Sequence, residues 1–166
     1  MKKLLLLLSA AFILLNCNRT KIDKCCTGVP QITAVDTSVL AMPNIFTPNA
    51  DGVNDVLDVL KKNISPNGFK FTVTSKSGRK IIFETTDPNL GWNGNYKGKF
   101  AKEREYNFDI VATTINGSLI SLSGKVCMIR DNCATGTVEN CFFATQFNGS
   151  VFDTSLPSYE TLKPCH

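Results

Sequence analysis

The chain has 166 residues and a formal net charge of +4, and 43% of its residues are hydrophobic. This length suffices for one domain with its own core, and the small net charge gives no reason to expect nucleic acid as a partner. The charge is uneven, because residues 61–106 hold ten Lys/Arg against four Asp/Glu, whereas residues 131–166 hold four acids against one lysine. The basic region is either a solvated face or a docking surface for an acidic partner or a polysaccharide.

The N-terminus has the features of an export signal. Two lysines precede a mostly apolar run from Leu4 to Leu15, which is shorter than the roughly 20 residues that a permanent membrane span needs. Cys17 follows the run directly, as in bacterial lipoprotein signals, although Asn16 stands where such signals usually have a small residue. We interpret residues 1–17 as a lipoprotein-type signal that ends at the lipidation site Cys17. The alternative is ordinary secretory cleavage.

The first half of the chain is predicted to contain short strands separated by polar turns. Residues 18–41 are expected to form a tether that leads into a first strand at Gln31–Val35. A second strand is predicted at Asn44–Thr47, followed by a turn at Thr47–Asp55 that is rich in Asn and Asp. The apolar run Val56–Leu60 is predicted to be the next strand.

The second half has the clearest strand patterns. Phe69–Ser75 alternates apolar and polar residues, and Lys80–Thr85 returns after a Gly-containing turn. Tyr106–Thr114 and Ser118–Ile129 flank Asn116-Gly117, a strong hairpin signal. Since no amphipathic helix is apparent, these elements predict an all-β fold, an Ig-like antiparallel β-sandwich of about seven strands.

Cysteines are frequent for a chain of this length. An even number of them in an exported protein indicates disulfides, and the six candidates besides Cys17 are Cys25, Cys26, Cys127, Cys133, Cys141 and Cys165. Six cysteines allow fifteen pairings, and their spacing does not choose among these. A zinc site is the alternative, although no histidine lies near the irregular spacings. Residues 131–166 are too few for an independent core, so we expect a disulfide-stapled extension that lies on the sandwich.

The Thr47–Asp55 turn offers oxygen atoms of the kind that a hard cation prefers. Aligned with a Ca²⁺-binding loop, the sequence gives four candidate ligands, Asn49, Asp51, Asp55 and Asp58. The alignment departs from that loop, because its first position is Thr instead of Asp and no flanking helices are predicted. The alternative is that these side chains cap the turn by binding their own backbone, with Gly52 at positive φ.

No catalytic constellation is apparent, and we expect no enzyme and no cofactor other than Ca²⁺. The one histidine, His166, is at the C-terminal end, where a general base is hard to hold, so Ser-His-Asp and Cys-His arrangements are not formed. Asp51 and Asp55 could pair as in glycosidases, but turn chemistry explains them better. Trp92 is predicted to be a core anchor beside Tyr96, the alternative being a carbohydrate platform.

Several segments occur in the order typical of one family. They are Met42–Asp55, Ile82–Thr86, Gly91–Lys99, Tyr106–Thr114 and Gly124–Arg130. Together, residues 42–130 resemble the gliding-motility-associated C-terminal domain, also called the type B sorting domain of the Bacteroidetes type IX secretion system. The sequence departs from the family pattern at Ala50, where Gly is usual, at Asn93, where Asp is usual, and at Ser75–Gly78, which lacks the family's tryptophan.

The resemblance implies a β-sandwich and a connection to type IX secretion. In the family such a domain ends a protein after a large cargo, whereas here 36 residues follow Arg130 and only residues 1–41 precede the domain. We therefore expect a non-enzymatic, lipid-anchored protein of the outer membrane or cell surface. It would bind or scaffold an envelope protein or polysaccharide and would not bind nucleic acid. The alternative is a secreted type IX client with a modified type B sorting domain. The sequence does not predict an oligomeric state.

Overall fold

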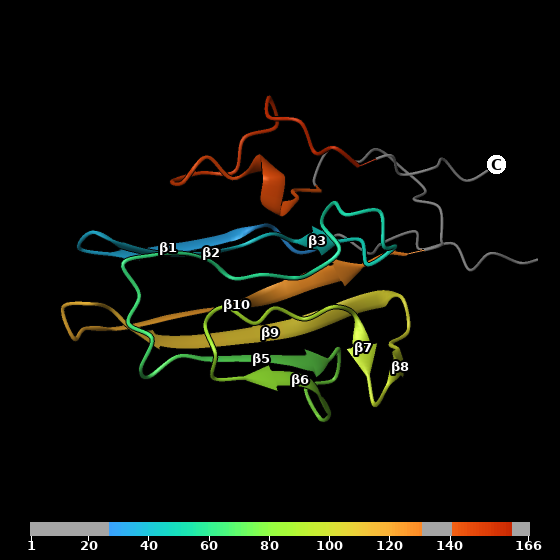
Figure 1. Ribbon diagram of the computed structural model, residues 1–166, viewed down its shortest axis with the longest axis horizontal. Coiled ribbons are helices and arrows are strands. Elements are labelled where there is room, and N and C mark those ends of the chain that lie inside the picture. Colours follow the sequence, from blue (N-terminus) through green and yellow to red (C-terminus); the bar gives the residue numbers. More distant parts are fainter. Residues whose placement is uncertain (1–26, 131–140, 161–166) are drawn as a thin grey trace, which may run out of the picture.

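The computed structural model describes residues 27–130 and 141–160, and this part of the chain is all-β (Figure 1). It holds one short 3-10 helix at Ala144–Gln146. Its strands are β1 (Gln31–Val35), β2 (Ser38–Met42), β3 (Ile45–Phe46), β4 (Leu60–Lys62), β5 (Lys70–Ser75), β6 (Ile81–Thr85), β7 (Asn95–Tyr96), β8 (Lys99–Phe100), β9 (Arg104–Thr113) and β10 (Leu119–Met128).

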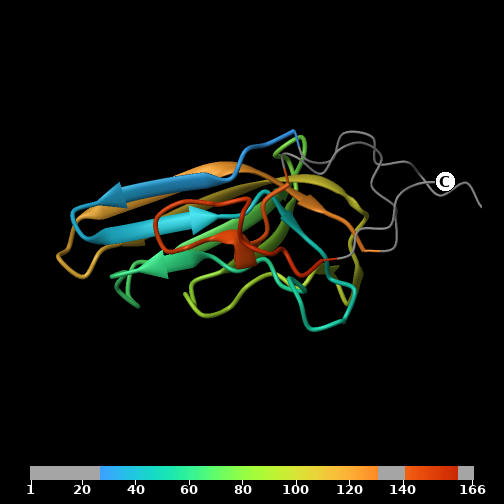
Figure 2. The same cartoon turned by 90° about the horizontal axis from the view of Figure 1, so that it is seen from above.

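The strands form a β-sandwich, as the sequence predicts. One sheet has the order β1-β2-β4, the other has the order β3-β10-β9-β5-β6, and β7 pairs with β8 beside them. Figures 1 and 2 show the two main sheets as two layers. The paired strands are antiparallel except for β3, which runs parallel to β10. In the described residues seven strands have three residues or more, and β3, β7 and β8 have two each.

The core lies between the two sheets because the long strands alternate over much of their length. In β9, Phe108, Ile110 and Ala112 are buried, whereas the intervening Asp109 and Val111 are exposed. β5 and residues 119–123 of β10 follow the same period of two, as expected for sheets with one apolar face, whereas Val126, Cys127 and Met128 at the end of β10 are all buried. Burial of each large apolar side chain contributes roughly 1.5–3 kcal/mol.

The first half of the chain differs from the predictions in two places. The strand β2, at Ser38–Met42, was not predicted; it pairs with β1 through a tight turn at Asp36, whose φ is 53°. It is buried on nearly its whole length, so it lacks the alternation that marks a half-exposed strand. The predicted strand Val56–Leu60 is an irregular segment, because Leu57 exchanges backbone hydrogen bonds with Trp92 instead of joining a sheet.

Residues 141–160 lie over the outer side of the sandwich, near β2 and β3 (Figures 1 and 2). Phe142 is bound at both its backbone groups, since Asn44 donates its backbone N–H to the Phe142 carbonyl and accepts the Phe142 N–H at its side-chain Oδ1 (3.2 and 2.7 Å). Phe143 packs with Ile45, Cys127 and Ile129 in a second, smaller core.

Cys127 and Cys141 are the two candidate disulfide cysteines within the described residues. Cys25, Cys26, Cys133 and Cys165 lie outside them, as does the predicted lipidation site Cys17. The disulfide stapling therefore stays a prediction. No helix within residues 27–130 and 141–160 is long and apolar enough to cross a membrane.

Candidate functional site

The Thr47–Asp55 turn is closed by its own side chains. Its ends are joined by the Thr47 N–H, which donates to the Asn54 carbonyl at 2.9 Å. The Asp55 carboxylate accepts the backbone N–H groups of Ala50 and Gly52 at 2.6 and 2.7 Å. Ala50 and Gly52 both have positive φ, 65° and 89°, a conformation that such capping of the backbone stabilises.

Two further candidate ligands take part in the same turn. Asn49 Oδ1 accepts the Asp51 N–H at 3.1 Å, and Asn49 Nδ2 donates to Asp51 Oδ2 at 3.0 Å. Asp51 Oδ1 accepts the Val53 N–H at 2.9 Å. The oxygen atoms that a cation would need are thus engaged by donors of the turn itself.

Asp58, the fourth candidate, lies apart from the turn, beside Gly91. A Cβ atom at Gly91 would come within 2.0 Å of Asp58 Oδ1. Partial removal from water raises the pKa of Asp58, and the positive charge of Lys61 partly opposes this. Within the described residues, no group of three or more His, Cys, Asp or Glu side chains is arranged to hold a metal ion. The calcium interpretation stays a prediction, and the hydrogen bonds support the turn-capping alternative.

Replacing Asp55 by alanine is expected to lower the free energy of unfolding by about 1–2 kcal/mol. Two hydrogen bonds to a charged group are lost, but both donors are exposed and regain water. Asp51→Ala, which removes fewer backbone contacts, serves as the control and is expected to cost less. Urea denaturation with and without Ca²⁺ measures the effect. A loss that grows clearly when Ca²⁺ is added would support a metal site instead.

The C-terminal segment contacts this turn. Thr47 Oγ1 donates to the Glu160 carboxylate, and Asn54 Nδ2 donates to the Ser158 carbonyl at 3.1 Å. Burial raises the pKa of Glu160, and the Thr47 hydrogen bond opposes this shift. The sequence did not predict the contact, because Thr47 and Glu160 are 113 positions apart.

Trp92 anchors the loop that follows β6 in the core, as predicted. Its side chain is fully buried, and its Nε1–H donates to the Asn95 carbonyl at 2.8 Å. Its ring packs against Phe46 and Tyr106, with centroids 5.2 and 4.9 Å away. These two rings, and not the expected Tyr96, are its ring partners. Full burial excludes Trp92 as a platform for carbohydrate.

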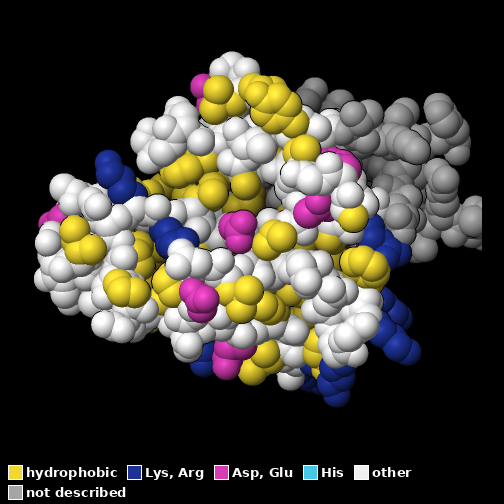
Figure 3. All heavy atoms as spheres, in the orientation of Figure 1, with side chains coloured by type: hydrophobic (Ala, Val, Ile, Leu, Met, Phe, Trp, Pro, Cys, Tyr) yellow, Lys and Arg dark blue, Asp and Glu magenta, His cyan; other side chains and the backbone are white. Residues whose placement is uncertain are grey.

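A basic pocket of about 610 Å³ opens where β7 and β8 meet the ends of β5, β6 and β9. It is lined by Ser75, Lys80, Ile82, Tyr96, Lys97, Lys99, Phe100, Ala101, Lys102, Arg104 and Tyr106. Figure 3 shows Lys and Arg side chains gathered at this edge of the molecule. The sequence indicated a basic region but did not indicate that five of its cations surround one hollow.

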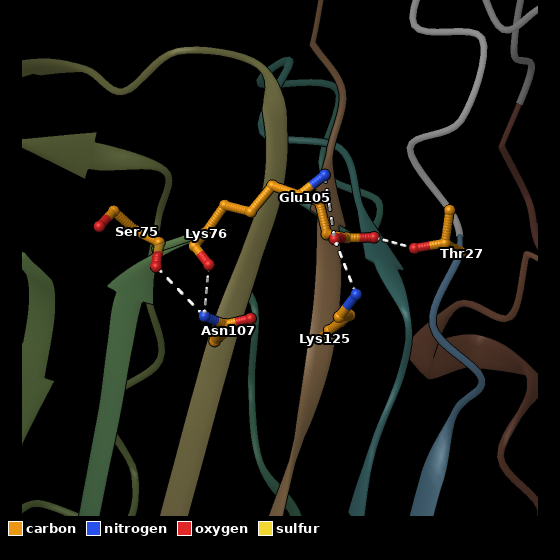
Figure 4. Close-up of polar contacts among 6 residues, drawn as sticks. All are labelled: Thr27, Ser75, Lys76, Glu105, Asn107 and Lys125. Carbon is orange, nitrogen blue, oxygen red and sulfur yellow. Dashed lines mark hydrogen bonds and ion pairs between the residues drawn. The ribbon is translucent and has the colours of Figure 1, made fainter. Parts of the chain in front are cut away.

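Glu105 forms a buried polar cluster on the outer face of the five-stranded sheet (Figure 4). Its side chain is 5% exposed, and its carboxylate accepts the Thr27 hydroxyl and lies 3.2 Å from Lys125 Nζ and 3.8 Å from Lys76 Nζ. Burial alone would raise the pKa of Glu105, but the Thr27 and Lys125 hydrogen bonds and the two lysine charges together hold it below its ordinary value. Nothing in the sequence pattern distinguished this glutamate from its neighbours.

Replacing Glu105 by glutamine is expected to cost about 1–2 kcal/mol of stability at pH 7, because the charged hydrogen bonds are lost. Since the folded pKa is lowered, Glu105 stabilises the fold above its ordinary pKa near 4.5 and loses this effect as the pH falls through the folded value. The difference between the two proteins should therefore shrink in acid.

Thermal unfolding from pH 7 down to pH 3 measures this difference. Glu84→Gln is the matched control, because Glu84 also pairs with a lysine, Lys70 at 3.0 Å, but is 40% exposed. It should change stability little at any pH. A Glu105→Gln deficit that stays constant across the whole pH range would contradict the assigned role of the carboxylate.

The fold and these features define a class of protein first: a small all-β sandwich domain with a self-capped Asn/Asp turn and a basic pocket. Residues 40–117, from β2 to the turn after β9, match the family model of the CHU_C type IX secretion signal domain. The match confirms the resemblance that the sequence motifs indicate. Residues 40–117 are thus similar to a sorting domain related to type IX secretion, and this similarity implies an exported protein connected with the cell surface. Searches of curated proteins and of solved structures found no match.

Proposed function

We propose that this protein is a lipid-anchored, non-enzymatic binding or scaffolding protein of the outer membrane or cell surface. The observation that carries the proposal is the pairing of two sequence features: a cysteine directly after a short apolar run, and a type IX secretion signal domain at residues 40–117. Lipid attachment at Cys17 would hold the sandwich at a membrane through the intervening residues. A single acyl chain binds only marginally, so stable anchoring requires the multiple chains of a lipoprotein.

The described surface fits a binding role. Five cations that form no ion pair within the described residues surround a hollow. The Asn and Asp side chains of the turn are used in capping, and Glu105 is used in holding Thr27. Disulfides among Cys25, Cys26, Cys127, Cys133, Cys141 and Cys165 would stabilise the C-terminal extension, each by about 2–4 kcal/mol.

Metabolic labelling with a palmitate analogue tests the anchor. The unchanged protein is expected to take up label and to partition into the detergent phase, whereas Cys17→Ser should lose both properties. Cys141→Ser is the matched control, because it removes a cysteine that is not proposed to carry lipid. Equal labelling of the Cys17→Ser protein and the unchanged protein would overturn the proposal.

A second candidate function is favoured by the family match alone: a secreted client that the type IX translocon exports by means of a modified sorting domain. Protease treatment of intact cells with and without a working translocon distinguishes it from the first. A client would lose its surface exposure when the translocon is deleted. Unchanged exposure would exclude this second candidate.

A further inference from the structure

The basic pocket combines high positive charge with a lining that contains no carboxylate. Its five cations are Lys80, Lys97, Lys99, Lys102 and Arg104, and no Asp or Glu lines it. None of the five forms an ion pair with another residue in the described part of the chain. Like charges held this close repel one another, so a bound anion would relieve an unfavourable arrangement.

Aromatic rings fix some of these cations at the rim. Lys80 Nζ lies 4.2 Å from the centroid of the Tyr96 ring, and Lys97 Nζ lies 5.5 Å from the same centroid. Arg130 Cζ lies 4.2 Å from the centroid of Phe100. Cation–π contacts of this kind hold charged groups in place at little entropic cost to a later ligand.

Phe100 provides an apolar surface within the same hollow. Its side chain is 53% exposed although it lines the pocket. Large exposed rings beside polar groups are typical of binding sites. The flat C–H face of a sugar ring could pack on Phe100 while its acidic groups reach the lysines. The volume of about 610 Å³ lies within the range of small-ligand sites, whereas an acidic protein would need a broader surface.

We propose that this pocket binds an acidic saccharide, that is, a sugar carrying carboxylate, sulfate or phosphate groups. Lys99 and Arg104 supply charge from β8 and the start of β9, and Phe100 supplies the stacking surface. The inference rests on the binding role proposed above and names its ligand class. Its test does not depend on lipidation, so the pocket and the anchor can fail separately.

The test measures binding of defined probes to the purified chain by titration calorimetry. An oligogalacturonate and a sulfated tetrasaccharide represent two sources of acidic sugar, a neutral maltotetraose lacks the charge, and a short polyglutamate peptide carries charge without sugar. At least one acidic sugar is expected to bind at low salt, and its binding is expected to weaken as NaCl rises to about 0.5 M. The neutral sugar and the peptide should bind at least about tenfold more weakly.

Matched variants connect binding to the pocket. Lys99→Gln combined with Arg104→Gln is expected to weaken the binding of the acidic sugar about tenfold or more. Lys61→Gln combined with Lys62→Gln removes the same charge from exposed β4 positions and should leave binding nearly unchanged. Phe100→Ala should weaken the binding of the acidic sugars but should leave the salt dependence of that binding unchanged. Leu119→Ala changes another exposed apolar residue and should have no effect on binding.

Three outcomes would overturn the proposal. The first is that neither acidic sugar binds, and the second is that the peptide binds as tightly as the sugars. The third is that the Lys99/Arg104 and Lys61/Lys62 double variants lose the same binding affinity.

Discussion

Replacing Trp92 by alanine is expected to lower the free energy of unfolding by about 3–5 kcal/mol. The side chain is fully buried between Phe46 and Tyr106, so the substitution removes a large apolar area and leaves a cavity between the two sheets. It also removes the donor to the Asn95 carbonyl, which is left without that bond. The backbone of Trp92 also exchanges hydrogen bonds with that of Leu57. The substitution should therefore destabilise the loop of Trp92 and the segment around Leu57.

Circular dichroism in a urea titration measures this loss, because Trp92 is the only tryptophan and its fluorescence disappears with it. Trp92→Phe keeps the ring packing but not the hydrogen bond and should fall between alanine and the unchanged protein. Phe100→Ala, at an exposed aromatic position, should change stability by no more than about 0.5 kcal/mol. A Trp92→Ala protein as stable as Phe100→Ala would show that the ring is not a core anchor.

Replacing Gly94 by alanine is expected to cost about 2–4 kcal/mol, from two separate causes. Its φ of +79° is unfavourable for any side chain with a Cβ. A Cβ there would also lie 2.8 Å from Pro48 Cγ and 3.2 Å from Met128 Sδ. Gly94 therefore lets the Trp92 loop pack directly against the start of the Thr47–Asp55 turn.

Gly98 separates the two causes. It has almost the same backbone conformation, with φ of +74°, but a Cβ there would meet nothing within 4 Å. Gly98→Ala should thus lower the free energy of unfolding only through backbone strain, by about 1–2 kcal/mol. Chemical denaturation of both variants gives the difference between them. Equal losses would mean that the close approach of Pro48 to Gly94 adds nothing to the cost.

The sequence predicted those parts of the fold in which one face of a strand is buried and the other is wet. Phe69–Ser75 and Tyr106–Thr114 alternate, and β5 and β9 lie at these positions within two residues at each end. The alternation of apolar and polar residues did not predict the structure where both faces of a strand are buried. It also did not predict it where a loop, instead of a strand, forms the backbone hydrogen bonds of a segment. β2 has no polar face to mark it, and Leu57 is held by Trp92, a long-range contact that local periodicity cannot encode.

The candidate sites follow the same division. The chemistry of the Thr47–Asp55 turn is local, so both of its interpretations could be formulated from the sequence. Its contact with Glu160, the ion pairs of Glu105 and the gathering of five cations around one hollow each join residues from separate segments of the chain. Such groups become visible only when register and layer packing are known.

The N-terminal residue of the mature protein in the membrane fraction tests the central claim most directly. Mass spectrometry of the N-terminal peptide is expected to find a chain that begins at Cys17 and carries acyl groups on it. A mature protein that begins at any other residue, or an unmodified Cys17 in membrane-associated protein, would contradict the proposal of a lipid-anchored protein.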